Sequence, residues 1–144
     1  MSADVLVIGY GNALRGDDGI GPVVAEELAA LASPGVRVIV AQQLMPEHAT
    51  DLAAVGRVVF VDAAVGGEPV TVTELGPETT TPSLTHTLDP RALLALARAA
   101  YGRSPRAWLV TGVGADFDYR DGLSEVGRRH ARLAAERVER LLRQ

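Results

Sequence analysis

Two carboxylates and one histidine are the side chains of this sequence best suited to chemistry. Asp18 follows a glycine-broken apolar run, Asp62 ends the apolar run RVVFVDA, and His86 lies in a long polar segment. Two carboxylates and an imidazole suit zinc, nickel or a similar divalent ion, and they leave coordination positions open for water or substrate. The spacing by itself does not establish a metal site, because an aspartate at a strand end often only caps the next turn.

The elements that must position these residues alternate between strand and helix along the chain. This alternation predicts an α/β fold, a three-layer α/β/α sandwich around a mixed five-stranded sheet. We expect strand order 2-1-3-5-4. Strand 4 alternates apolar and polar residues, which suits an edge, and the short turn before it favours antiparallel pairing. The expected strands are 5–9, 36–41, 57–63, 70–75 and 107–113. Helices are expected from about 21, over 47–55, over 90–101, and from 125 with Val126, Leu133, Val138 and Leu141 turned inward.

This topology predicts where the three residues lie. Ligands of open α/β sheets bind outside the carboxyl ends of the strands, where the winding reverses. Asp62 ends the third strand and Asp18 lies in the loop that leaves the first, so the two should face each other across one crevice. His86 precedes the helix that leads to the fifth strand, and it can reach the same rim.

Composition limits the classes of function. The length of 144 residues suits one domain, 1–144, and the absence of cysteine excludes thiol nucleophiles and cysteine metal sites. All 14 basic residues are arginine, which excludes a P-loop or Schiff-base lysine. The net charge of −4 argues against a nucleic-acid partner. No apolar run is long enough for a membrane span, and no signal-peptide pattern is visible, so we expect a cytoplasmic protein.

Two other motif readings are weaker. A dinucleotide fingerprint fails because Leu14 stands where its last glycine belongs, and Gln42 stands where the ribose-binding acid belongs. Asp116, Asp118 and Asp121 faintly suggest a calcium loop, but the spacing is wrong and the closing glutamate is missing. The arginines of the last helix are interspersed with glutamates, which suits a solvated face and leaves an acidic partner as an alternative.

Several motifs together resemble one known family. GYGNALRGDDGIG, FVDAAVGGEP, the later His86 and a GLS turn before the last helix are similar, in order and spacing, to motifs of the [NiFe]-hydrogenase maturation endopeptidases, peptidase family M52. The resemblance covers nearly the whole chain. It implies that Asp18, Asp62 and His86 are the metal ligands and that Asp17 is a turn or helix-terminus residue.

The resemblance also implies an activity. Members remove the C-terminal extension of the hydrogenase large-subunit precursor after nickel insertion, so the partner would be that precursor and the nickel would be the substrate's own. Zinc or cadmium can take the place of nickel in crystals. Asp18 and Asp62 would be the catalytic acids of a hydrolase classed in the family as aspartic-type.

The segment after the second strand departs from the common family pattern. It resembles the HQL segment of one subgroup, although Gln42 stands where that subgroup has histidine. We expect substrate contacts from this segment, at Gln42, Gln43, Leu44 and Glu47.

Two mechanisms remain open at this point. A metal could activate the scissile carbonyl or a water while a carboxylate takes the proton, or nickel could only position the peptide. Two other classes of function remain as well, a non-catalytic assembly factor that binds the nickel-loaded large subunit and a small-ligand α/β domain.

Overall fold

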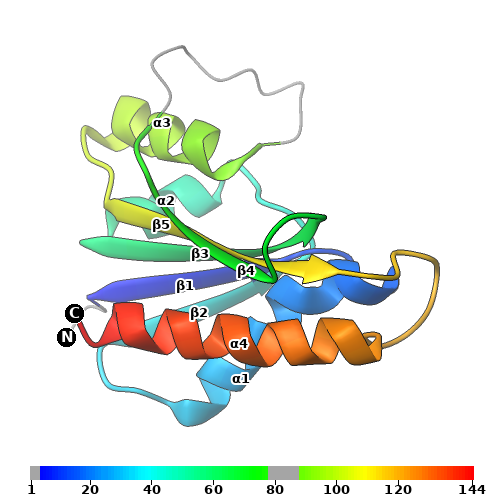
Figure 1. The fold of residues 1–144 in the computed structure, drawn as a ribbon. Helices are drawn as coiled ribbons and strands as arrows, with labels where there is room; N and C mark the ends of the chain where they lie inside the picture. Colours follow the sequence, from blue (N-terminus) through cyan, green and yellow to red (C-terminus); the bar gives the residue numbers. More distant parts are fainter. Residues whose placement is uncertain (1–3, 78–87) are drawn as a thin grey trace.

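The computed structural model describes residues 4–77 and 88–144 (Figure 1). The described strands are β1 Val5–Tyr10, β2 Val36–Ala41, β3 Arg57–Val65, β4 Val70–Leu75 and β5 Arg106–Gly114. The described helices are the short 3₁₀ helix η1 Gly16–Gly19, then α1 Ile20–Leu31, α2 His48–Ala53, α3 Pro90–Tyr101 and α4 Glu125–Leu142. Asp18 therefore lies in a 3₁₀ turn rather than in an irregular loop.

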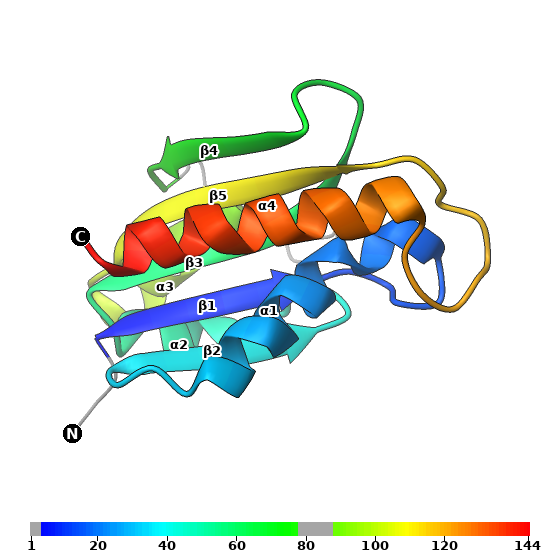
Figure 2. The same ribbon diagram turned by 60° about the horizontal axis from the view of Figure 1, so that its bottom comes forward.

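The sheet has the predicted order β2-β1-β3-β5-β4. The strands β1, β2, β3 and β5 run parallel, and β4 is antiparallel to β5, as expected. Figure 2 shows β2 and β4 at opposite rims of the sheet. The tight turn after β3 does reverse the chain, but it makes no hairpin, because β5 lies between β3 and β4.

Helices cover both faces of the sheet, with α2 and α3 on one side and α1 and α4 on the other (Figures 1 and 2). The side chains of β3 alternate between the two layers. Val58 and Phe60 join the core under α2 and α3, whereas Val59 and Val61 join the core under α1 and α4. All four are at most 1% exposed, as expected for a strand buried on both faces.

Side-chain caps start the two longer predicted helices of the second half. Asp89 accepts a hydrogen bond from the backbone N–H of Ala92 at the start of α3, and Ser124 accepts one from Gly127 at the start of α4. The prediction that Leu133 turns inward is wrong, since its side chain is 40% exposed. Val138 and Leu141 are buried as predicted, and the small residues Ala131, Ala134 and Ala135 complete the buried face, because α4 packs close to the sheet and to α1. None of the described helices combines the length and apolarity that crossing a membrane requires.

Candidate carboxylate site

Asp18 is held at the carboxyl end of β1 by a tight glycine turn. The backbone N–H of Asn12 donates a 2.6 Å hydrogen bond to Asp18 Oδ2. Gly11 has φ +150°, and a Cβ there would lie 1.9 Å from the Asp18 carbonyl oxygen. Glycine is therefore required where the chain passes over Asp18, and this turn brings the carboxylate back to the strand end.

Asp62 lies on β3 beside Tyr10 of β1. The register pairs Gly9 with Val61, so the next residue of each strand lies at the same level of the sheet. Asp62 accepts a 2.8 Å hydrogen bond from the Ala63 backbone N–H, and the Tyr10 hydroxyl lies near enough to its carboxylate to act on its pKa.

The environment of Asp62 favours its protonated form. Burial and, to a smaller extent, the nearby negative charge of Asp18 together raise its pKa to about 6, although the Ala63 N–H and the Tyr10 hydroxyl act to lower it. Burial and the Asp62 charge likewise raise the pKa of Tyr10 far above its usual value, so the phenol stays protonated. The structure thus brings Asp18 and Asp62 close enough for one charge to act on the other.

Asp17 has a structural role, in agreement with the expectation that it is a turn or helix-terminus residue and not a metal ligand. It is the only fully buried charged side chain among the described residues. Its carboxylate accepts hydrogen bonds from the Ser124 hydroxyl and backbone N–H, at 2.6 and 2.8 Å, and from the backbone N–H groups of Ala115 and Asp116, at 2.7 and 3.0 Å. Burial alone would raise the pKa of Asp17, but these four donors outweigh it and lower the pKa. The ionised carboxylate therefore ties η1 to the loop between β5 and α4.

His86 lies outside the described residues, so the predicted third ligand stays a prediction. Within residues 4–77 and 88–144, no group of three histidine, aspartate or glutamate side chains is arranged around a common point. Among the described hydrogen bonds, Asp18 Oδ1 has none and so keeps a coordination position.

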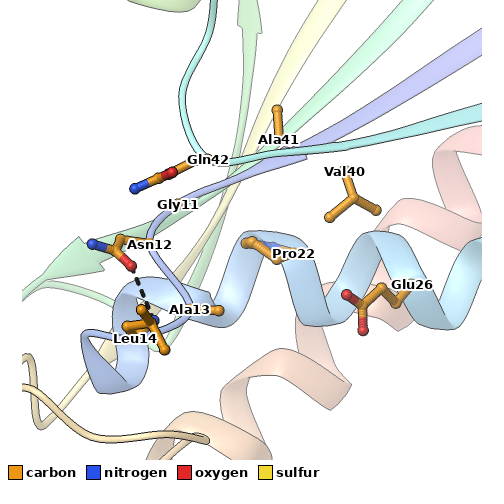
Figure 3. A pocket seen from close by; sticks show the side chains of 9 residues that line it. All are labelled: Gly11, Asn12, Ala13, Leu14, Pro22, Glu26, Val40, Ala41 and Gln42. Atoms are coloured by element: carbon orange, nitrogen blue, oxygen red, sulfur yellow. Dashed lines mark hydrogen bonds between the residues drawn. The ribbon is translucent and has the colours of Figure 1, made fainter.

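The segment predicted to contact substrate divides into exposed and buried parts. Gln42, Gln43 and Glu47 are exposed, whereas Leu44 is 3% exposed and packs in the core with α2 and α3. Leu44 therefore lies in the core and not on a contact surface, because the loop must anchor itself before α2 begins. Gln42 lines a hollow of about 320 Å³ at the carboxyl ends of β1 and β2 (Figure 3).

The acidic loop after β5 satisfies its own polar groups. Asp116 accepts a hydrogen bond from the Asp118 backbone N–H and forms a 3.1 Å ion pair with Arg120. This is the behaviour of a self-capped polar loop rather than of a calcium loop.

Tyr10 and Asn12 are site residues that the sequence patterns did not single out. The sequence did contain a signal for Tyr10. In the expected strand order the first strand lies beside the third, so Tyr10, which follows the first strand, lies next to Asp62. Asn12 contributes its backbone N–H, a role that no side-chain pattern reveals.

No protein-family profile and no curated protein matches the sequence. Among solved structures, the fold is similar to that of the hydrogenase maturating endopeptidase HybD from E. coli, with a TM-score of 0.76, 24% identity, and coverage of 99% of this chain and 93% of that chain. The [NiFe] hydrogenase maturation protease HycI from Thermococcus kodakarensis gives a TM-score of 0.72 at 29% identity, over 99% and 94% of the two chains. An endopeptidase from Escherichia coli gives 0.71 at 26% identity, over 96% and 90%. These full-length matches support the family that the sequence motifs indicate, the hydrogenase maturation endopeptidases.

Proposed function

We propose that this chain is an endopeptidase that removes the C-terminal extension of a [NiFe]-hydrogenase large-subunit precursor after nickel insertion. We propose that it acts in the cytoplasm. The observation that carries the proposal is the pairing of Asp18 with Asp62 at the carboxyl edge of the sheet, with the pKa of Asp62 raised to about 6. The fold of known maturation proteases supports it.

A carboxyl group with a pKa near 6 suits peptide hydrolysis at neutral pH. It is present in both protonation states, so it can take a proton from an attacking water and return one to the leaving amine. Burial, with a smaller contribution from the Asp18 charge, raises the pKa of Asp62, and the nearby Tyr10 hydroxyl acts against that rise. This division of roles needs no symmetric sharing of one proton between the two acids.

The substrate's nickel would meet a donor set of suitable chemistry. Asp18 keeps an oxygen without a hydrogen bond among the described residues, Asp62 lies close by, and we propose His86 as the third donor. Carboxylate oxygens and imidazole nitrogen suit Ni²⁺ and Zn²⁺. A bound divalent ion polarises a carbonyl or lowers the pKa of a water, and the same contact would position the precursor.

The test is a cleavage assay with a nickel-loaded large-subunit precursor, followed by intact-mass spectrometry. We expect loss of a C-terminal peptide from the nickel-loaded precursor and not from the nickel-free one. An unchanged mass with a correctly loaded cognate precursor would overturn the proposal, and stable binding without cleavage would favour an assembly factor.

Asp62→Asn should abolish cleavage while the domain stays folded. The amide can still accept the Ala63 hydrogen bond, but it cannot carry the proton, so the rate should fall by at least about a thousandfold. Tyr101→Phe is a control, because this exposed tyrosine contacts Thr50 far from Asp62. Cleavage at the unmodified rate by the Asp62→Asn variant would remove Asp62 from the mechanism.

A further inference from the structure

The hollow beside Asp18 opens at the free edge of the sheet. Its lining comes from the turn after β1, from the first turns of α1 and from the end of β2: Gly11, Asn12, Ala13, Leu14, Pro22, Glu26, Val40, Ala41 and Gln42. Asn12 both lines this hollow and donates to Asp18. Asn12 is therefore shared between the hollow and the candidate site.

The wall of the hollow is apolar and exposed to solvent. Leu14 is 64% exposed and Val40 is 45% exposed, and Figure 3 shows the Val40 and Pro22 side chains on the same side of the sheet. Two large aliphatic side chains left open around a concavity mark a contact surface better than singly scattered ones do. Glu26 borders the far rim, which disfavours an acidic occupant.

The backbone of β2 offers hydrogen-bonding groups at the same place. β2 is the outermost strand, and Gly11 donates to the Ala41 carbonyl, so the peptide groups of Ala41 face β1. Successive residues of a strand direct their N–H and C=O groups to opposite sides, which leaves those of Val40 facing outward. Neither group has a hydrogen-bond partner among the described residues. An edge of this kind pairs readily with an extended chain.

From these observations we propose that the polypeptide substrate binds as an extended strand along the free edge of β2 and places an aliphatic side chain in the hollow beside Asn12. This inference rests on the proposed function, since it takes the occupant to be the substrate segment that adjoins the cleaved bond. A residue opposite Val40 on an added strand has its side chain on the same face of the sheet as Val40. That face holds Leu14 and Pro22, so one docked segment satisfies the backbone edge and covers the apolar wall.

Two test variants, each with a control, separate the contribution of the β2 backbone from that of the apolar hollow. Val40→Pro removes the outward N–H without breaking a bond to β1, and Val40→Ala is its control because it shortens the side chain and keeps the N–H. Leu14→Asp places a charge in the hollow, and Leu31→Asp is its control, because Leu31 is also exposed, at 57%, and lies at the other end of α1.

The experiment measures KM and kcat for the nickel-loaded precursor, with Kd from direct titration of the same precursor. Relative to their controls, we expect Val40→Pro to raise KM and Kd about fivefold and Leu14→Asp about tenfold, with kcat nearly unchanged. Melting curves check that each variant is folded, and Leu14→Asp, in an exposed turn, remains informative if the proline variant unfolds. Equal Kd values for variants and controls would overturn the docking, whereas binding without any cleavage would overturn only the proposed activity.

Discussion

The adjacent residues Asp17 and Asp18 have opposite surroundings, and this contrast separates their roles. Asp17 is fully buried and accepts four hydrogen bonds, which hold it ionised. Asp18 accepts one from Asn12 and lies beside Asp62. A carboxylate whose oxygens are all engaged stabilises structure, while one with a free oxygen can meet a metal or a peptide. This contrast favours our proposal that Asp18 and Asp62 carry the chemistry of the site.

Asp62 should lower the stability of the metal-free protein above pH 6. Its pKa is about 6 when folded and near its ordinary 3.8 when unfolded, so the unfolded chain gives up this proton more readily and stability falls as pH rises between these values. The amide side chain of the Asp62→Asn variant does not titrate. Between about pH 4.5 and about pH 8, the free energy of unfolding of this variant should therefore rise by roughly 1–2 kcal/mol relative to that of the parent protein. This value is reduced for solvent screening.

Urea unfolding at the two pH values, with a chelator present, measures this gain. Asp51→Asn is a control for removing a surface carboxylate, because Asp51 forms an ion pair with Arg37 far from the site. A relative stability of Asp62→Asn that does not change with pH would show that the Asp62 carboxyl is not perturbed in the folded protein.

At the scale of elements, the site depends on a clasp between η1 and the start of α4. Ser124 caps α4 through Gly127 and also donates to Asp17, so one side chain joins both elements. Gly127 is needed there, because a Cβ would lie 2.1 Å from Asp17 Oδ1. Helical glycine usually costs stability, and here the cost makes room for the buried carboxylate.

Gly127→Ala should therefore destabilise the protein by about 2–3 kcal/mol, although the same change normally stabilises a helix. Gly56→Ala is the matched control, because the nearest atom to its added Cβ lies 3.9 Å away. In an Asp17→Ala background the clash is absent, so Gly127→Ala should there be neutral or stabilising. Equal losses of unfolding free energy in both backgrounds would show that the destabilisation does not come from the Asp17 carboxylate.

Over the whole molecule, one sheet carries two cores, and β3 contributes to both. Phe60 is buried under α2 and α3, whereas Trp108, the one tryptophan of the sequence, is buried under α1 and α4. The strands that separate the two cores place side chains in both of them, so a change that loosens one core also weakens the other. We expect the described part of the chain to unfold cooperatively.

Phe60→Ala tests this coupling. The truncation should lower the free energy of unfolding by about 3–5 kcal/mol. If the layers unfold together, the fluorescence transition of Trp108 should shift by the same amount as the far-ultraviolet circular dichroism. A variant in which the Trp108 transition stays in place while the dichroism shifts would show that the two layers unfold separately.

The sequence by itself determined the strands and the sheet order, because apolar runs, glycine breaks and caps are local signals. It also pointed to the two acids as site candidates, because ligand sites of such sheets lie at the carboxyl ends of strands. It also separated Asp18 from Asp17, through the family resemblance. Only the tertiary structure decided that Asp17 joins η1 to α4, that Leu133 faces solvent, that Leu44 is buried, and that burial raises the pKa of Asp62. Each of these depends on which surfaces meet after the layers pack, and residues far apart in the chain, such as Asp17 and Ser124, have no local pattern that announces their contact.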